Sequence, residues 1–335
     1  MARSRLLPDN FTLTLLAVVA IATLFPASGT VAVVLGWITN LAIALLFFMH
    51  GAKLSREAII AGASHWRLHL LVLSITFVIY PLLGLALRPI LSPILPIELY
   101  LGVLFLCALP STVQSSIAFT SLARGNVSAA ICTASASSLV GIFMTPILVG
   151  VLLNTQGESG STLDAMGKIV LQLLVPFIAG HFARRWIGAW VDRNKSWLKY
   201  VDQSSILLVV YTAFSAAVVG GIWQQIPIQS LLVLALVCSV LLVILLVGTT
   251  VLARKLGFNK EDEITIVLCG SKKSLATGVP MAQVLFSSST IGPMLLPIML
   301  FHQMQLMVCA VLAQRYAERK DDLPEVEAQA QKPAP

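Results

Sequence analysis

Ten apolar segments, most of them long enough to cross a lipid bilayer as helices, run through the chain and limit what it can fold into. A helix needs about 20 apolar residues to span the hydrocarbon core. With 57% hydrophobic and only 11% charged residues among 335, the composition predicts an all-α polytopic membrane protein with ten transmembrane helices. The segments lie at approximately 11–25, 31–49, 68–87, 98–123, 127–153, 163–182, 204–223, 228–252, 262–286 and 290–313.

The distribution of lysine and arginine predicts how these helices are oriented. With the N-terminus inside, 18 basic residues fall in cytoplasmic segments and only Arg88 and Lys168 fall outside. Basic loops stay on the cytoplasmic side. We therefore expect a multi-pass protein of the bacterial cytoplasmic (inner) membrane, with cytoplasmic residues 1–10 and a disordered cytoplasmic tail, 317–335.

The positive charge of the chain is explained by the same basic loops. The net charge of +7 comes from short segments between apolar ones, so it orients helices and does not indicate nucleic-acid binding. The longest such segment, 184–202, alternates tryptophan and tyrosine with basic residues. It is predicted as an amphipathic connector in the cytoplasmic headgroup region.

Ten spans divide into two sets of five, 11–153 and 163–316. An odd number of helices in each half places the second half upside down in the membrane, which predicts two inverted repeats. The interrupted spans are then the fourth and the ninth, at equivalent places in the two halves. Paired interruptions of this kind are typical of the binding site of a secondary transporter.

Both interruptions consist of polar residues inside an apolar span. In the ninth, Lys272 and Lys273 each cost about 2.5–3.5 kcal/mol on insertion scales, and Gly270 and Gly278 weaken the helix around them. In the fourth, residues 110–116 begin with a proline and are otherwise nearly all polar. We expect the helices to break there, since irregular backbone at membrane depth survives only within protein or along a cavity.

Several chemistries are missing from the apolar segments. No acidic residue is expected in the middle of a span, and no metalloprotease or nucleophile-elbow motif is present, so the chain is not predicted to be an enzyme. The five cysteines lack paired spacing and are expected to be free thiols, without a metal site. His302 is a weak candidate for proton handling, and a packed histidine is the simpler interpretation.

The candidate ion- and substrate-binding residues are hydroxyl, amide and lysine side chains near the breaks. Hydroxyl and carbonyl oxygens can coordinate a hard cation such as sodium, although small hydroxyl residues also pack helices together. Ser115 and Ser116 are the candidate sodium ligands, and no cofactor is expected beyond sodium as a coupling ion. The full set is Thr76, Thr112, Gln114, Ser115, Ser116, Thr133, Ser135, Ser271, Lys272, Lys273, Ser274 and Gln303.

Three interpretations of Lys272 and Lys273 are open from the sequence. The side chains extend to a membrane interface, or one ammonium group stands where a sodium ion sits in related proteins. Alternatively, one lysine pairs with an anionic substrate, assisted by a half-helix that begins near Ser274. The sequence does not decide which of the two lysines faces a cavity.

The chain resembles the bile acid:sodium symporter family, in the branch that contains bacterial symporters and the seventh vertebrate member. The resemblance covers residues 11–315 and is carried by 48–55 (FMHGAKLS), 110–146 with LARGNV at 122–127 and Thr145-Pro146, and 270–276. It implies ten helices in two inverted repeats, divided into a four-helix panel and a six-helix core. It also implies that helices four and nine are broken and cross, with substrate bound between panel and core.

The family pattern for sodium sites is altered in this chain. Ser115-Ser116 stands for a Ser-Asn pair, Thr76 for a glutamine of the third helix, and Leu268 for a glutamate of the ninth. Lys272-Lys273 replaces a Gln-Asn pair. Each change removes an oxygen ligand or adds a cation.

We therefore expect a secondary active transporter that moves a small organic anion by alternating access in the lipid bilayer. Sodium symport is the family expectation, and proton coupling or uniport suits these residues as well. The alternative, a different class of function, is a membrane regulator of ion homeostasis. Calcium is the candidate ion because the related eukaryotic proteins are linked to calcium handling. Substrate-protected accessibility of Cys269 is expected for a transporter. Neither the substrate nor the oligomeric state follows from the sequence.

Overall fold

The computed structural model describes residues 10–53, 65–154, 170–221, 226–286 and 288–319, and every regular element within these ranges is helical. The elements are α1 (Asn10–Leu24), α2 (Gly29–Lys53), α4 (Trp66–Ser74), η2 (Ile75–Ile79), α5 (Tyr80–Ala86), α6 (Arg88–Leu91), α7 (Ile97–Ala108), α8 (Gln114–Leu122), α9 (Val127–Asn154), η3 (Val170–Leu174), α11 (Val175–Arg193), α12 (Lys195–Val219), α14 (Ile228–Lys255), α15 (Lys260–Gly270), α16 (Leu275–Leu285) and α17 (Ser288–Ala317).

The helices coincide with the predicted apolar segments. Six helical stretches in the described part of the chain are long and apolar enough to cross a membrane, and the shorter α1 and α7 are also apolar. The all-helical class and both predicted interruptions are confirmed, because α7 and α8 are separated by residues 109–113 and α15 and α16 by 271–274. The number of crossings and the inverted repeats stay predictions. Residues 1–9, the connection 155–169 and the tail from 320 lie outside the described residues.

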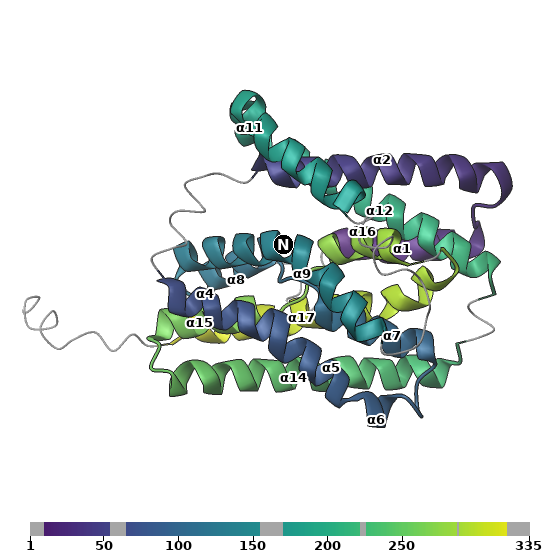
Figure 1. Ribbon diagram of the computed structural model, residues 1–335. Coiled ribbons are helices and arrows are strands. Elements are labelled where there is room, and N and C mark those ends of the chain that lie inside the picture. The colour runs from purple at the N-terminus through teal and green to yellow at the C-terminus, as the bar shows by residue number, and fades with distance from the viewer. Residues whose placement is uncertain (1–9, 54–64, 155–169, 222–225, 287, 320–335) are drawn as a thin grey trace, which may run out of the picture.

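The helices pack into two groups. In the first group α2 packs against α11 and α12, and α12 also packs against α1. The second group contains α4 to α9 and α14 to α17, in which α17 packs on α7, α8, α14 and α16, and α15 packs on α4, α8, α9 and α14. The groups meet chiefly where α12 packs against α16 and α17. In Figure 1, α2 and α11 form the top of the molecule and α14 lies along the bottom.

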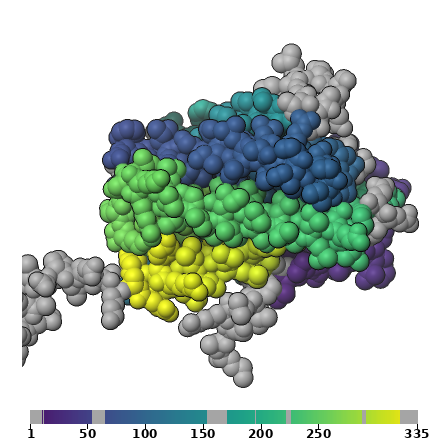
Figure 2. All heavy atoms as spheres, turned by 90° about the horizontal axis from the view of Figure 1, so that it is seen from below, coloured from purple at the N-terminus to yellow at the C-terminus, as the bar shows by residue number. Residues whose placement is uncertain are grey.

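The outer surface of α14 is an apolar stripe. Its exposed large side chains recur every three or four residues, so they share one face of the helix. They are Ile228, Leu232, Leu236, Val240, Val243, Ile244, Val247 and Val251. Figure 2 shows the helix in green on the surface, between the blue α4 and α5 and the yellow α17. Such a long exposed apolar stripe cannot face water. With the other apolar helices, it makes the chain a multi-pass membrane protein.

The connector predicted at 184–202 is helical, so its assignment to a loop between spans is wrong, while its place in the headgroup region stays a prediction. The chain stays helical through α11 to Arg193 and resumes in α12 at Lys195, with only Asn194 between them. Trp186, Trp190, Trp197 and Tyr200 are exposed on these helix ends. Counting charges assigns the segment to a loop, whereas the aromatic and basic residues in fact continue the helices beyond the apolar spans.

Two glycines allow α2 and α11 to touch backbone to backbone. A Cβ atom on Gly51 would overlap the carbonyl of Phe177, and one on Gly180 would overlap the carbonyl of Phe48. Small residues are the usual means by which membrane helices approach closely. The contact places the C-terminal turn of α2, with His50 and Lys53, at a fixed position against α11.

We expect Gly180→Ala to destabilise the protein by at least the roughly 1–3 kcal/mol that overpacking costs, because the methyl group meets main-chain atoms that cannot rotate away. Gly36→Ala is the matched control, since Gly36 lies within α2 and a methyl group added there would meet no atom within 4 Å. That control should be neutral or slightly stabilising. The measurement is thermal unfolding in detergent, and equal melting temperatures for both variants would contradict the packing argument.

Candidate functional site

The two interrupted spans meet at their breaks. Helix α7 ends at Ala108 before Pro110, and Leu109 is extended, as expected for a residue that precedes proline. The backbone N–H of Ser274, between α15 and α16, donates a 2.9 Å hydrogen bond to the carbonyl of Pro110. Segments that lie far apart in the chain are thereby joined through their main chains.

The first break leaves carbonyl groups without helical partners, and other segments supply the donors. A helix ends with four unsatisfied carbonyls, which are costly within a membrane. At the end of α7, the Thr145 hydroxyl of α9 donates to Ala108 at 2.8 Å, and Lys273 Nζ donates to Cys107 at 2.8 Å and Leu109 at 2.6 Å. The carbonyls of Cys107 and Leu109, on either side of Ala108, therefore both accept hydrogen bonds from one lysine of the other break.

The second break is satisfied reciprocally by the first. The Ser111 hydroxyl donates to the carbonyl of Cys269 at 2.5 Å, and the Ser116 hydroxyl donates to that of Leu268 at 3.2 Å. Tyr80 of α5 donates from its hydroxyl to the Ser271 carbonyl at 2.5 Å. Each interruption thus provides hydrogen-bond donors that the other one lacks.

Pro81 explains why a third carbonyl, that of Thr76, can accept a hydrogen bond from Lys273. In the π-helical turn η2 the N–H of Tyr80 bonds to the carbonyl of Ile75, five residues earlier. The next bond in this register would join residue 81 to Thr76, but Pro81 has no N–H to donate. The Thr76 carbonyl is therefore available and accepts from Lys273 Nζ at 2.9 Å.

Lys272 is as deeply buried as Lys273 but donates fewer hydrogen bonds. Its Nζ atom donates to the Ser115 carbonyl at 3.0 Å and lies 4.3 Å from the centroid of the Phe119 ring. Both lysines have fully buried side chains. Neither extends to an interface, so the snorkelling interpretation is wrong for both of them.

Gln305 of α17 fixes the backbone at Lys273. Its side-chain oxygen accepts from the Lys273 N–H at 2.8 Å, and its amide nitrogen donates to the Lys273 carbonyl, also at 2.8 Å. The His302 ring lies 2.9 Å from the same amide nitrogen. A glutamine can mimic the two hydrogen bonds of a neighbouring strand, and here it does so for the unwound residue.

A cavity of about 740 Å³ lies between the two helix groups. It is large enough for an organic molecule of drug size. One wall comes from α1, α2, α11 and α12, and the other from α8, α9, α17, the start of α16 and both breaks. Its polar or charged lining residues are His50, Lys53, Thr112, Gln114, Ser115, Ser135, Ser138, Lys199, Asp202, Gln203, Ser274, Thr277, His302 and Gln303.

Half of the sequence-derived candidates line this cavity. They are Thr112, Gln114, Ser115, Ser135, Ser274 and Gln303. Ser116, Ser271, Lys272 and Lys273 lie buried at the crossing behind it, and so does Thr76, which contributes its main-chain oxygen to Lys273. Thr133 is also buried and contacts His69. Ser274 caps α16 by accepting a 3.2 Å hydrogen bond from the N–H of Thr277.

The structure corrects three placements. Asp202 lies within α12, one of its carboxylate oxygens is paired with Lys53, and it lines the cavity, whereas charge counting puts it in a loop. His50 and His69 lie at the ends of apolar segments in the sequence, which predicts interfacial positions, but His50 lines the cavity and His69 is buried in α4. Cys269 is fully buried and does not line the cavity, so it is not a suitable reporter of substrate binding.

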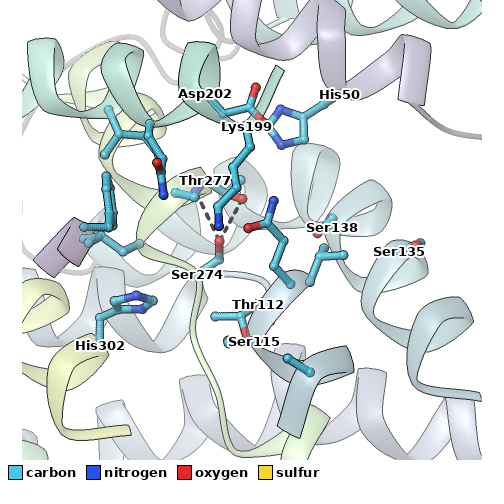
Figure 3. A pocket seen from close by; sticks show the side chains of 18 of the residues that line it. His50, Thr112, Ser115, Ser135, Ser138, Lys199, Asp202, Ser274, Thr277 and His302 are labelled. Atoms are coloured by element: carbon cyan, nitrogen blue, oxygen red, sulfur yellow. Dashed lines mark hydrogen bonds between the residues drawn. The ribbon is translucent and has the colours of Figure 1, made fainter. Parts of the chain in front are cut away.

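The wall formed by α2 and α12 carries a net positive charge. Lys53 Nζ lies 2.5 Å from Asp202 Oδ2, and the His50 ring lies within the field of both charges. Lys199, which has no carboxylate partner among the described residues, points from α12 into the cavity on the side of Ser274 and Thr277 (Figure 3). Two lysines face one carboxylate, so an anion is favoured there.

Sequence reasoning missed this charged wall because it searches for polar residues inside apolar segments. Lys199, Asp202 and Gln203 occupy positions i, i+3 and i+4 of α12, which places them on one face of a helix. A three-residue spacing also relates His50 to Lys53 at the end of α2. A search for polar helix faces beyond the ends of the apolar spans would have found both.

The described residues contain no group of three histidine, cysteine or acidic side chains that could hold a metal ion. At the crossing, the Thr112 hydroxyl is 2.9 Å from that of Ser116 and accepts from that of Ser115 at 2.8 Å. These oxygens bond to one another and to the neighbouring main chain. The hydrogen bonds that these hydroxyls make to described residues go to other hydroxyls and to the Leu268 carbonyl, not to a carboxylate.

Comparison with known proteins identifies the family. The model of the SBF-like CPA transporter family (DUF4137) matches residues 9–318. The chain belongs to this family. The expected relationship to the bile acid:sodium symporters is confirmed, and the family membership makes the protein a transporter homologue.

Three relatives illustrate the range of similarity. The chain is 71% identical to the protein PA2026 of Pseudomonas aeruginosa over 96% of its own length and 97% of the relative. It is 59% identical to a protein named Putative symporter YfeH of Escherichia coli, over 94% and 95%. It is 27% identical to Sodium/bile acid cotransporter 7 of Rattus norvegicus over 82% of both chains.

We expect Tyr80→Phe to lower the free energy of unfolding by about 1–3 kcal/mol, because the buried Ser271 carbonyl then loses its donor. Tyr211→Phe is the matched control, since the Tyr211 hydroxyl donates to the Phe25 carbonyl at 2.9 Å in an exposed place away from both breaks. Chemical unfolding in mixed micelles measures both. An equal loss in the two variants would show that the Tyr80 hydrogen bond does not hold the break.

We expect Ser138→Cys to react with a water-soluble thiol reagent and Ser137→Cys to resist it. Ser138 lines the cavity, whereas Ser137 is buried and accepts a hydrogen bond from the Ser111 N–H at 3.0 Å. The five native cysteines are all buried and should give a low background. The measurement is labelling in intact membranes, and equal labelling at the two neighbouring positions would contradict the cavity.

Proposed function

We propose that this protein is a secondary transporter that moves a small organic anion across the bacterial cytoplasmic membrane. The observation that supports the proposal is the cavity of about 740 Å³ between the two helix groups, with lysines on one wall and hydroxyl groups on the other. Membership in a transporter family supports the same class of function. A substrate that fits such a cavity carries an anionic group and an apolar body.

The lining residues suggest how such a substrate is held. The apolar side chains Phe11, Phe47, Phe177 and Met307 line the cavity together with the polar residues. A mixed lining of this kind buries an apolar body and fixes its orientation through a few polar groups. Lys199 supplies a positive charge, and Thr277, at the N-terminal end of α16, adds a hydroxyl group.

We infer that the two helix groups are the moving parts of an alternating-access cycle. In this proposal the chain crosses the membrane ten times in two inverted repeats, with α1, α2, α11 and α12 as a panel and the other helices as a core. The broken spans cross within the core, where their hydrogen bonds would make them move as one body. The panel and the core then rock about the substrate and expose it to each side in turn.

The orientation completes the proposal. Lysine and arginine residues are concentrated in segments that the topology puts in the cytoplasm, which favours cytoplasmic N- and C-termini. The exposed apolar stripe of α14 would face lipid.

We expect Lys199→Gln to weaken the binding of anionic substrates by roughly tenfold or more, since a charge-assisted hydrogen bond contributes about 1.5–3 kcal/mol. The test compares carboxylated and sulfonated amphiphiles, taurocholate among them, with neutral analogues by thermal stabilisation of the purified protein, followed by counterflow in proteoliposomes for each anion that stabilises it. Lys255→Gln, an exposed lysine at the end of α14, is the matched control. Equal stabilisation by neutral analogues, or an unchanged response of Lys199→Gln, would refute the assignment.

A further inference from the structure

Lys273 is surrounded by main-chain oxygens rather than by a counter-ion. Its Nζ atom donates to three carbonyls, those of Thr76, Cys107 and Leu109, at 2.6–2.9 Å. The ring of Tyr80 covers it, with the centroid 4.0 Å away. Three carbonyl acceptors match the three N–H groups of the ammonium form, whereas a neutral amine has only two. No acidic side chain of the described residues pairs with it.

The oxygens around Lys273 are set by the fold and not by the lysine. The Thr76 carbonyl is available because Pro81 has no N–H, and the other two carbonyls are available because α7 stops at Ala108 before Pro110. These features remain whatever side chain occupies position 273. Converging carbonyl groups of unwound backbone are the ligands with which membrane proteins bind monovalent cations.

We propose that these three carbonyls form a monovalent-cation site and that the Lys273 ammonium is a tethered cation that fills it permanently. The protein then assembles the crossing of its two broken spans without a sodium ion. Only one consequence of this inference rests on the proposed transport function: substrate movement should not depend on sodium.

The surroundings of the site favour this interpretation over a free sodium ion beside the lysine. A second ammonium, that of Lys272, lies at the same crossing and donates to Ser115. The nearby hydroxyls of Thr112, Ser115 and Ser116 are engaged with one another. Without a carboxylate to offset two buried ammonium groups, a third cation would be repelled.

The test is thermal unfolding of the full-length protein, purified in the chloride salts of sodium, potassium, methylammonium or tetramethylammonium at one ionic strength. The wild-type melting temperature should be the same in sodium and potassium. Lys273→Ala should melt lower and should regain stability in methylammonium, which restores the donors, by mass action. Tetramethylammonium has no N–H and should give no recovery.

Lys273→Met is the matched control. The methionine side chain fills the space of the lysine without an N–H donor, so this variant should not respond to methylammonium. A sodium-specific rise in the wild-type melting temperature would overturn the proposal, because it would reveal a separate sodium site. A folded Lys273→Ala that ignores methylammonium would also overturn it. If Lys273→Ala folds only when prepared in methylammonium, the proposal is supported.

The transport consequence is measured separately. The anion to use is one that stabilises the wild type more than Lys199→Gln and shows counterflow. Its initial rate of uptake should be unchanged when external sodium is replaced by potassium. Failure of the Lys199 test alone would refute the proposed function and leave the melting results intact. Sodium-dependent uptake with a sodium-dependent melting temperature would refute the tethered cation and leave the transporter assignment intact.

Discussion

The interaction on which this structure depends is the exchange of hydrogen bonds between two broken helices. Stopping a helix within a membrane exposes carbonyl groups that water cannot reach. Here Ser111 and Ser116 donate to carbonyls of α15, while Lys273 and the Ser274 N–H donate to carbonyls in the last turn of α7 and just after it. Neither break would be stable alone. The helices that carry them, and α9 and α17 that pack around them, are therefore tied to a single arrangement.

Part of the crossing could be predicted from the sequence. Two adjacent lysines in an apolar span are costly enough to require a local solution, and a proline followed by polar residues requires another. The sequence could not show that Lys273 fills the place between the two breaks while Lys272 contacts Ser115. Which carbonyl a lysine reaches depends on residues in the other half of the chain, and a single sequence contains no information on that pairing.

The candidate cavity was predictable on one side only. Thr112, Gln114, Ser115 and Ser274 line it next to the breaks, where polar residues stand out against an apolar background. The opposing wall was hidden because Lys199 and Asp202 lie where α12 extends beyond its apolar span. A hydropathy window treats such a helix end as a loop. Burial against α2, through the pair of Asp202 with Lys53, turns it into part of the cavity wall.

The glycine contact between α2 and α11 links packing to recognition. Gly51 lies between His50 and Lys53 in sequence, and its close approach to Phe177 determines how far the end of α2 stands from α11. The two helices are consequently fixed against each other, with the charged residues at the end of α2 held in one position. A methyl group added at Gly180 would push α2 away from α11 and displace those charged residues. The lining of the cavity could thus be changed from a position that does not itself line it.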